Sequence, residues 1–177
     1  MAPSAILFNA ITALTHQSLY LAGHNAVSKL KRESLGVKDP THKHVQFWSS
    51  VFTGITVIAN RITPRHRDAG GSFPWYDLLL SCGTHQQAYL HLNDIRAKLS
   101  YSPGTIVLVC GKLLSHSLPQ WSHGERICLA HFMRKEVFHR LGVYSPSWSL
   151  QGAYTRLMNK TFTAEQGWTE KRDYAMM

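Results

Sequence analysis

Between about residue 47 and residue 134, the chain consists of short apolar runs separated by turn residues, and this pattern constrains the fold most strongly. Turn sequences such as Ser102-Pro103-Gly104 and Trp121-Ser122-His123-Gly124 separate the runs. Short runs of this kind, spaced by turns, predict an antiparallel β-sandwich or jelly roll. The runs are rich in Val, Ile, Leu, Thr and Tyr and cover residues 51–62, 76–82, 86–92, 105–110, 112–118 and 125–133.

The flanking segments show helical periodicity instead. Apolar residues recur at three- and four-residue steps from residue 4 to about residue 33, which predicts one or two amphipathic helices. Residues 35–43 contain Gly36, Asp39 and Pro40 and have the composition of a linker or turn. Helical spacing returns after Arg134, in the sequences RKEVFHRLGV and SWSLQGAYTRLMNK.

We therefore expect a single mainly β domain with flanking helices, of the α+β class, over the 177 residues. Its predicted parts are an N-terminal helical segment (1–46), a jelly-roll core (47–134), C-terminal helices (135–165) and a tail (166–177).

The charge of the chain favours a polyanionic partner. Nineteen Lys and Arg residues against ten Asp and Glu residues give a formal net charge of +9 at pH 7. Such an excess favours nucleic acid through phosphate contacts and counterion release. The basic residues are scattered rather than clustered, so a solvated basic surface without a nucleic-acid partner remains an alternative.

Three further features bear on the cellular compartment. No apolar run approaches the roughly 20 residues that a membrane-spanning helix needs, so we expect no membrane partner. The first residues have no cationic leader before their apolar part, which argues against a secretory signal. The three cysteines form no C-x-x-C pair, and we expect buried thiols in an intracellular, reducing compartment.

The triplet His66-Arg67-Asp68 is a candidate for two arms of a metal site. Side chains at i and i+2 of a strand point the same way, so both could reach one metal ion. A non-haem Fe(II) oxygenase site uses two histidines and one carboxylate. His116, fifty residues and about three strands later, could supply the second histidine.

Two further observations bear on this hypothesis. A 2-oxo acid co-substrate needs a cation for its far carboxylate, and Arg126, which opens the next strand, could supply it. A second H-x-[DE] sequence, His123-Gly124-Glu125, is present, but no later strand set or arginine follows it in the required order. We expect His123 to lie in a hairpin turn and Glu125 to pair with a surface cation.

The motifs of residues 47–140, taken together, resemble those of the TET/JBP family of 2-oxoglutarate- and Fe(II)-dependent dioxygenases, in its compact fungal branch. In order they are H-R-D, W-Y-D-L-L, Y-x-P-G-T-x-V, G-K-x-L-x-H and E-R-I-C-x-A-H-F-M-R. The resemblance implies a double-stranded β-helix core and use of Fe(II), 2-oxoglutarate and O2. It implies that His66, Asp68 and His116 ligate iron and that Arg126 binds the 2-oxoglutarate carboxylate. Asn60 and Arg61 match positions that help to hold the co-substrate.

The resemblance also implies a substrate, which is a methylated base in DNA, above all 5-methylcytosine oxidised to 5-hydroxymethylcytosine and further. The base must be flipped out of the duplex to reach the iron. Gly70 and Gly71 would let the loop after Asp68 approach the base, and Asp77 could accept a hydrogen bond from its exocyclic amine. Trp75 and Tyr76 are candidates for stacking on it. An enzyme of this kind is expected to be a nuclear monomer.

Three alternatives remain open from the sequence. The base could be N6-methyladenine, on which a fungal relative acts. The domain could be a catalytically idle nucleic-acid-binding jelly roll. The same iron site could also serve protein or small-molecule substrates.

Overall fold

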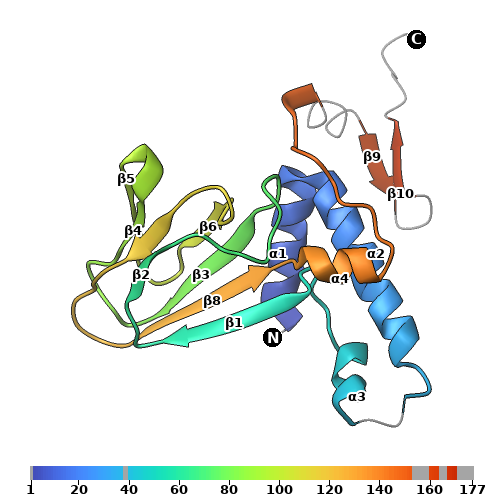
Figure 1. Cartoon of the computed structure of the whole chain (residues 1–177), viewed down its shortest axis with the longest axis horizontal. Helices are drawn as coiled ribbons and strands as arrows, with labels where there is room; N and C mark the ends of the chain where they lie inside the picture. Colours follow the sequence, from blue (N-terminus) through green and yellow to red (C-terminus); the bar gives the residue numbers. More distant parts are fainter. Residues whose placement is uncertain (1, 38–39, 153–159, 164–166, 171–177) are drawn as a thin grey trace.

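The computed structural model describes residues 2–37, 40–152, 160–163 and 167–170, and eight strands of the described part form two four-stranded antiparallel sheets (Figure 1). The first sheet has the order β1-β8-β3-β6 and the second has the order β2-β7-β4-β5. The chain passes from one sheet to the other between consecutive strands, except from β4 to β5, as in a double-stranded β-helix, which confirms the predicted jelly-roll core. The strands are β1 (Gly54–Ala59), β2 (Thr63–His66), β3 (Asp77–Gly83), β4 (Tyr89–Leu92), β5 (Ala97–Ser100), β6 (Ile106–Val109), β7 (His116–Leu118) and β8 (Arg126–Phe132).

Two apolar layers lie on opposite faces of the first sheet. Leu79 and Cys128 face the second sheet and pack with Leu90 and Leu118, whereas Leu78 belongs to a second cluster with residues of the helices. Side chains alternate between the two faces of a strand, so a sheet covered on both faces needs apolar residues at successive positions. The near-continuous apolar run of β3 follows from this arrangement.

The N-terminal segment forms two helices, α1 (Ala2–Thr15) and α2 (Gln17–Ser34), as the periodicity predicted. They are divided at His16, whose Nδ1 accepts a hydrogen bond from the amide of Leu19 at 3.3 Å. Phe8 and Leu19 pack from these helices against Leu78, so the helices cover the face of the first sheet that is turned away from the second sheet. None of the described helices has the length and apolar character needed to cross a membrane.

The structure differs from the prediction in four segments. The expected linker 35–43 includes the start of a short helix, α3 (Pro40–Gln46), which has proline at its first position, where the missing N–H costs nothing. The run 51–62 is interrupted because Asn60 adopts a left-handed conformation with φ 50°. Strands β2 and β5 were not predicted as separate strands. Both are short edge strands, and β2 contains Pro64, which sheets accept at their edges.

The C-terminal part matches the prediction in part, because residues 135–140 and 151–152 are helical as predicted. Helix α4 (Lys135–Arg140) begins where helical periodicity was predicted. Strands β9 (Lys160–Thr163) and β10 (Gly167–Glu170) pair antiparallel, so the predicted helix does not extend over 160–163, and 167–170 is a strand within the predicted tail. Threonine and aromatic residues in both segments favour strands. The remainder of the predicted helix, at 153–159, lies outside the described residues.

A buried histidine makes the stability of this fold dependent on pH. His131 packs between the helices and the sheet, with its ring 4.6 Å from that of Phe8 and 5.9 Å from that of Phe52. Burial lowers the pKa of His131 below its ordinary value of 6.5. The unfolded chain therefore binds more protons below about pH 6.5, so stability is lost as the pH falls through that value.

We expect the free energy of unfolding to fall between about pH 7 and about pH 5, and to fall less in a His131→Leu variant. Urea unfolding at several pH values measures this difference. A His24→Gln substitution at an exposed position is the control. An equal pH dependence in wild type and His131→Leu would contradict the assignment to His131.

Candidate metal centre and co-substrate cavity

A cavity of about 490 Å³ opens between the two sheets and collects nearly all the residues that the sequence singled out. Its volume is in the range of pockets that hold small ligands, about 300–1,000 Å³. The predicted site residues that line it are Arg61, His66, Asp68, Gly70, Gly71, Asp77, His116 and Arg126. Asn60 and the two predicted stacking residues, Trp75 and Tyr76, are the exceptions.

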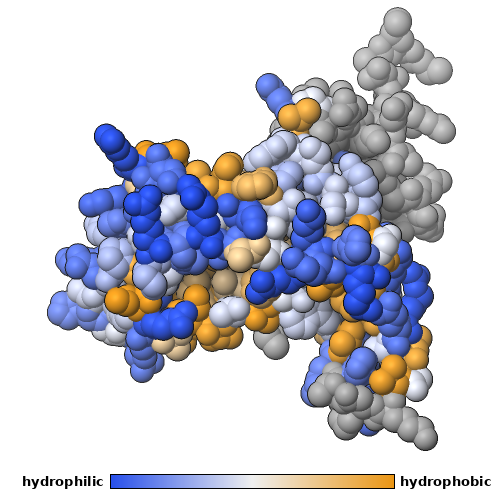
Figure 2. Space-filling view, in the orientation of Figure 1, coloured by the Kyte–Doolittle hydropathy of each residue, from blue (hydrophilic) through white to orange (hydrophobic). Residues whose placement is uncertain are grey.

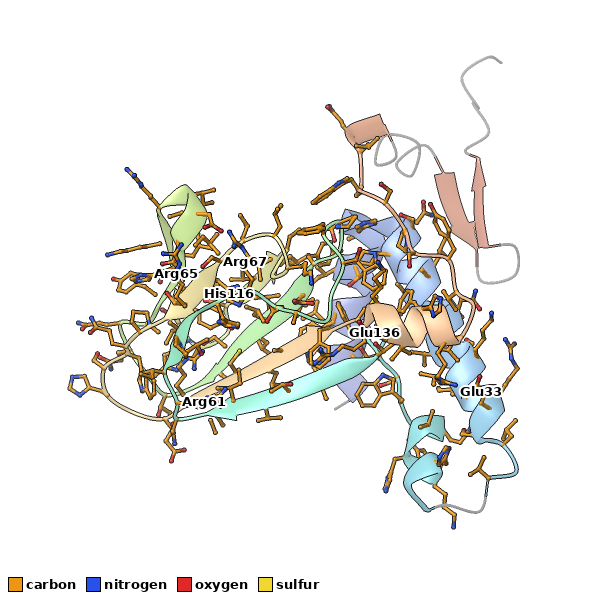
Figure 3. All side chains as sticks on the ribbon, viewed as in Figure 1. Glu33, Arg61, Arg65, Arg67, His116 and Glu136 are labelled. Atoms are coloured by element: carbon orange, nitrogen blue, oxygen red, sulfur yellow. The ribbon has the colours of Figure 1, made fainter. Side chains whose placement is uncertain are left out.

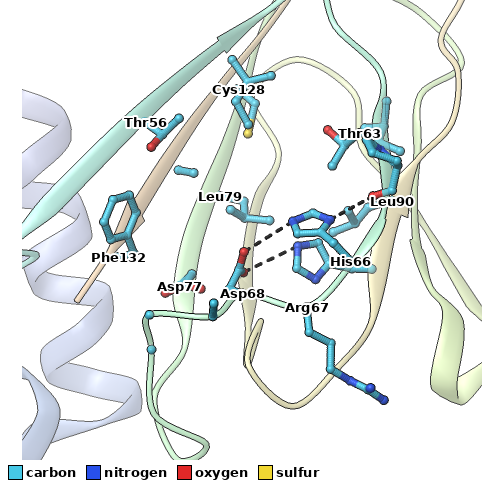
Figure 4. Close-up of a pocket in the computed structure, with 18 of the residues that line it drawn as sticks. Thr56, Thr63, His66, Arg67, Asp68, Asp77, Leu79, Leu90, Cys128 and Phe132 are labelled. Carbon is cyan, nitrogen blue, oxygen red and sulfur yellow. Dashed lines mark hydrogen bonds and ion pairs between the residues drawn. The ribbon is translucent and has the colours of Figure 1, made fainter. Parts of the chain in front are cut away.

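His66, Asp68 and His116 converge on one point of this cavity (Figure 4). Nε2 of His66 lies 3.4 Å from Oδ1 of Asp68, and Nε2 of His116 lies 3.7 Å from Oδ2 of the same carboxylate. One potential ligand atom from each of the three residues lies within 4.8 Å of the others. Ligands about 2.1 Å from a common metal ion lie about 3 Å apart when adjacent, so a small contraction suffices to bind one.

Backbone carbonyls orient both imidazole rings. Nδ1 of His66 bonds to the carbonyl oxygen of Pro64 at 2.9 Å, and Nδ1 of His116 bonds to that of Leu114 at 3.0 Å. A carbonyl only accepts, so each Nδ1 carries the proton and each Nε2 keeps its lone pair for a metal. Histidines that ligate metals are commonly oriented in this way by a hydrogen bond from the other nitrogen.

Strand pairing brings the two histidines together. His66 ends β2 and stands opposite His116, which begins the neighbouring antiparallel strand β7. Their ring centroids are 4.3 Å apart. Asp68 follows the end of β2, and its amide donates to the carbonyl of Gly111 at 2.9 Å. The fifty residues between the histidines are therefore bridged by one cross-strand pair.

Gly111 is required for the position of the Asp68 carboxylate. A Cβ atom at this position would lie 2.0 Å from Oδ2 of Asp68 and 2.8 Å from Oδ2 of Asp77. Both distances are shorter than real Cβ contacts, so the carboxylates would have to move. Gly111 is the glycine of the G-K-x-L-x-H motif, but it was not predicted to be a site residue.

We expect a Gly111→Ala variant to remain folded but to bind Mn(II) or Fe(II) at least about tenfold more weakly, because loss of support around a metal ligand commonly has that effect. Titration of the purified protein with Mn(II) measures it. Gly104→Ala is a control for loss of a glycine, because nothing lies within 4 Å of its Cβ position, although its φ of 89° adds strain. Unchanged Mn(II) affinity in Gly111→Ala would contradict the prediction.

Arg126 is a buried cation in the wall of the same cavity. Its residue is only 2% exposed, and its Nη1 donates to the carbonyl of Arg61 at 3.1 Å. Its Nε has no hydrogen-bond partner among the described residues. Its guanidinium carbon lies 5.8 Å from the ring centroid of Tyr101 and 5.7 Å from that of Trp121. A buried guanidinium with an unused donor is suited to an anionic ligand, because an unpaired buried charge is costly.

Asn60 and Arg61 differ in what they do here. The side chain of Asn60 accepts a hydrogen bond from the amide of Arg126 at 2.9 Å, and the amide of Asn60 donates to the carbonyl of Arg126 at 2.8 Å. Asn60 therefore holds the backbone of Arg126 and does not itself line the cavity. Arg61 lines the cavity, and its carbonyl receives the hydrogen bond from Arg126.

The three residues predicted to contact the substrate also line the cavity. A Cβ on Gly70 would lie 2.0 Å from Nη1 of Arg134, so the side chain of Arg134 would have to shift, whereas Gly71 has more space. Asp77 begins β3 and is buried. Burial, together with the nearby carboxylate of Asp68, raises the pKa of Asp77 to about 8.

The predicted stacking residues do not lie in the cavity. Trp75 is buried in the cluster between helices and sheet, packs on Phe138 with ring centroids 4.6 Å apart, and donates to the carbonyl of Pro146. Tyr76 contacts Thr15 of α1. Tyr101 and Cys128, which the sequence analysis did not single out, line the cavity instead, with the phenol oxygen 3.3 Å from the thiol sulfur.

The second H-x-[DE] sequence has no matching cluster. His123 has a left-handed backbone conformation with φ 49° in an exposed turn, as expected of a hairpin residue. Among the described residues, His66, Asp68 and His116 are the only group of three or more His, Cys, Asp or Glu side chains arranged to hold a metal ion.

The chain is similar to one protein family and to solved structures. A family model described as Tet_JBP, "Oxygenase domain of the 2OGFeDO superfamily", matches residues 10–135. Solved structures that match include "NgTET1 in complex with 5mC DNA", at 19% identity and a TM-score of 0.47. That match covers 60% of this chain and 42% of the solved one, so the chain spans less than half of its length. No match was found among curated proteins.

The family match covers part of α1, all of α2 and α3, both four-stranded sheets and the whole candidate site. Enzymes of this superfamily use Fe(II) as cofactor and 2-oxoglutarate and O2 as co-substrates, and the two histidines, the carboxylate and the buried arginine provide suitable donors. The chain therefore belongs to the Tet_JBP family of 2-oxoglutarate- and Fe(II)-dependent dioxygenase domains.

Proposed function

We propose that this domain oxidises the methyl group of a methylated base in DNA, with 5-methylcytosine as the preferred base. The observation that carries the proposal is one cavity that combines His66, Asp68 and His116 with the buried cation of Arg126. A 2-His-1-carboxylate set leaves coordination positions open for co-substrate and O2. Family membership and the net charge of +9 favour a nucleic-acid substrate over a neutral small molecule.

In this proposal His66, Asp68 and His116 hold Fe(II), which supplies the oxidising chemistry when it is bound with 2-oxoglutarate and O2. The carbonyls of Pro64 and Leu114 accept from the Nδ1 atoms and so leave both Nε2 atoms available to bind the metal. Arg126 binds the far carboxylate of 2-oxoglutarate with the donors that face the cavity. Asn60 and the carbonyl of Arg61 hold Arg126 in place.

The loop after Asp68 is proposed to receive the base. Gly70 and Gly71 line the cavity without side chains, so a flipped base can approach the backbone closely. Asp77 presents its carboxyl group to the same space and is proposed to contact the base edge.

Hydrophilic side chains gather over β2, β4 and β5 on the face shown in Figure 2, and Arg61, Arg65 and Arg67 are exposed on β2 and beside it. They are available for phosphate contacts around the base. A monomer acting in the nucleus completes the proposal.

Mass spectrometry of nucleosides tests this function. The protein is incubated with Fe(II), 2-oxoglutarate and duplex DNA that carries either 5-methylcytosine or N6-methyladenine. We expect 5-hydroxymethylcytosine and higher oxidation products from the first DNA, and no product from an Asp68→Ala control. Loss of N6-methyladenine instead would change the assigned base, and absence of product from both DNAs would overturn the proposed substrate. Absence of Mn(II) or Fe(II) uptake would indicate an idle binding module.

A further inference from the structure

The strand that carries His66 is weakly constrained by its sheet. Strand β2 lies at the edge of the second sheet, and β7 is its only neighbour among the described strands. The paired positions are Thr63 with Leu118 and His66 with His116, and the register shifts between them. An irregular ladder at a sheet edge leaves some of its backbone groups unpaired. Backbone pairing therefore places the two histidines opposite each other, but the irregular ladder leaves β2 with few bonds that hold it against β7.

Asp94 connects both strands through its side chain. It lies on the short 3-10 helix η1 (Asn93–Ile95), between β4 and β5. Its Oδ1 lies 3.6 Å from Nη2 of Arg65, and its Oδ2 lies 3.0 Å from Nη2 of Arg67. The same Oδ2 accepts a hydrogen bond from the amide of Ser115 at 2.6 Å. One carboxylate thus contacts both residues that flank His66 and the residue that precedes His116.

The two arginines also bind the segment before β7 directly. Nε of Arg65 donates to Oγ of Ser115 at 2.9 Å, and Nε of Arg67 donates to the carbonyl of Leu113 at 3.1 Å. Neighbouring side chains alternate along a strand, so Arg65 and Arg67 can point away from the face that His66 uses. Figure 4 shows Arg67 extending away from the carboxylate of Asp68. The network therefore lies beside the three candidate ligands, and of its members Arg67 also lines the cavity.

The network has the properties of a stable electrostatic contact rather than of a loose surface pair. The side chain of Asp94 is 27% exposed, whereas those of Arg65 and Arg67 are 66% and 57% exposed. The amide of Ser115, together with Arg67 and Arg65, lowers the pKa of Asp94, so its carboxylate is charged at neutral pH. A network of several charges that also bonds to a backbone amide holds its geometry better than an isolated exposed pair.

We propose that Asp94 is a positioning residue that holds His66 and His116 at the separation required to share one metal ion. This inference rests on the proposed role of the two histidines as metal ligands. Metal binding restricts the motion of β2 relative to β7, and this restriction costs free energy. If Asp94 already restricts that motion, less free energy is lost on binding and the metal affinity is higher.

Mn(II) titration of four variants tests the role of Asp94. Asp94→Ala and Asp94→Asn are expected to bind Mn(II) about tenfold more weakly than wild type, in line with the loss of an outer-shell partner. Asp94→Glu keeps the charge and is expected to restore most of the affinity. Glu33→Gln is the matched control, because it removes a surface ion pair with Arg140 at 2.9 Å on helix α2. Figure 3 shows Glu33 far from Arg65, Arg67 and His116.

A double-mutant cycle separates positioning from a general loss of stability. In a chain that carries Arg65→Gln and Arg67→Gln, removing Asp94 should cause a smaller loss of Mn(II) affinity than it does in wild type, because only its hydrogen bond from the amide of Ser115 remains to be lost. Thermal unfolding of each variant without metal reports stability separately.

Equal Mn(II) affinity in Asp94→Ala and wild type would overturn the positioning role alone. A weakening of equal size in Glu33→Gln would also overturn it. If wild type and Asp68→Ala both fail to bind Mn(II), the metal site itself is wrong, and this inference fails with it.

Discussion

Replacing Asp68 with alanine is expected to abolish 2-oxoglutarate-dependent turnover and to weaken Mn(II) or Fe(II) binding by more than about a hundredfold. Losing a residue that only supports a metal ligand costs up to about a hundredfold in affinity, and losing a ligand itself should cost more. Asp68 supplies the only carboxylate in the three-residue cluster, with oxygens 3.4 Å and 3.7 Å from the two histidines. Without it, two neutral imidazoles remain to hold a divalent cation.

The fold should survive this substitution. The side chain of Asp68 is 37% exposed and lies in a loop, so its removal leaves no core cavity. Circular dichroism and thermal unfolding check the fold, and metal titration together with succinate release checks the site.

The second H-x-[DE] sequence of the chain provides a matched control. Glu125→Ala removes a carboxylate from the same sequence pattern, but Glu125 is exposed and belongs to no metal-binding cluster among the described residues. It is expected to leave metal affinity and turnover unchanged. Retained turnover in Asp68→Ala, or equal losses in both variants, would refute the assigned metal site.

Replacing Arg126 with methionine is expected to raise the concentration of 2-oxoglutarate needed for half-maximal turnover by about thirtyfold or more. Truncating one partner of a buried charge pair costs about 2–5 kcal/mol, and each 1.4 kcal/mol corresponds to a factor of ten. Methionine retains much of the apolar contact that the arginine stem makes near Tyr101 and Trp121. Mn(II) affinity in the absence of co-substrate should be close to that of wild type.

Binding of 2-oxoglutarate to the Mn(II)-loaded protein, measured by calorimetry, separates this effect from catalysis. Arg140→Met serves as control, because Arg140 is an exposed arginine of α4 that pairs with Glu33 outside the cavity. An unchanged 2-oxoglutarate affinity in Arg126→Met would show that the buried guanidinium does not bind the co-substrate. Loss of Mn(II) binding in the same variant would point to a structural role for Arg126 instead.

Strand prediction succeeded where apolar residues make the pattern strong and failed at the sheet edges. The runs around β3 and β8 are buried between two apolar layers, so their composition alone identifies them. Strands β2 and β5 are short, largely exposed and partly polar, and β2 contains a proline. Their existence depends on neighbours that complete the ladder. The hairpin of β9 and β10 likewise depends on pairing between two segments. The first was predicted to be the end of a helix and the second to be part of the tail.

The candidate site was also predicted only in part. The order of His66, Asp68, His116 and Arg126 along the chain was enough to predict one cavity containing all four, because strand spacing limits where such residues can meet. Trp75 and Tyr76 were misplaced, since an aromatic side chain beside a strand can face either the helices or the cavity. Register decides which face it takes, and a shift of one residue reverses it.

The kind of fold and the candidate metal ligands could be predicted from local periodicity and from side-chain chemistry at set spacings, and the family from the resemblance of its motifs. The contacts that support the candidate ligands could not be predicted and are known only from the folded structure. Asp94 meets Arg65 and Ser115 across separations of 29 and 21 residues, and Gly111 leaves room for a carboxylate 43 residues earlier in the chain. No local pattern encodes such contacts, because they exist only after two sheets have closed around one cavity.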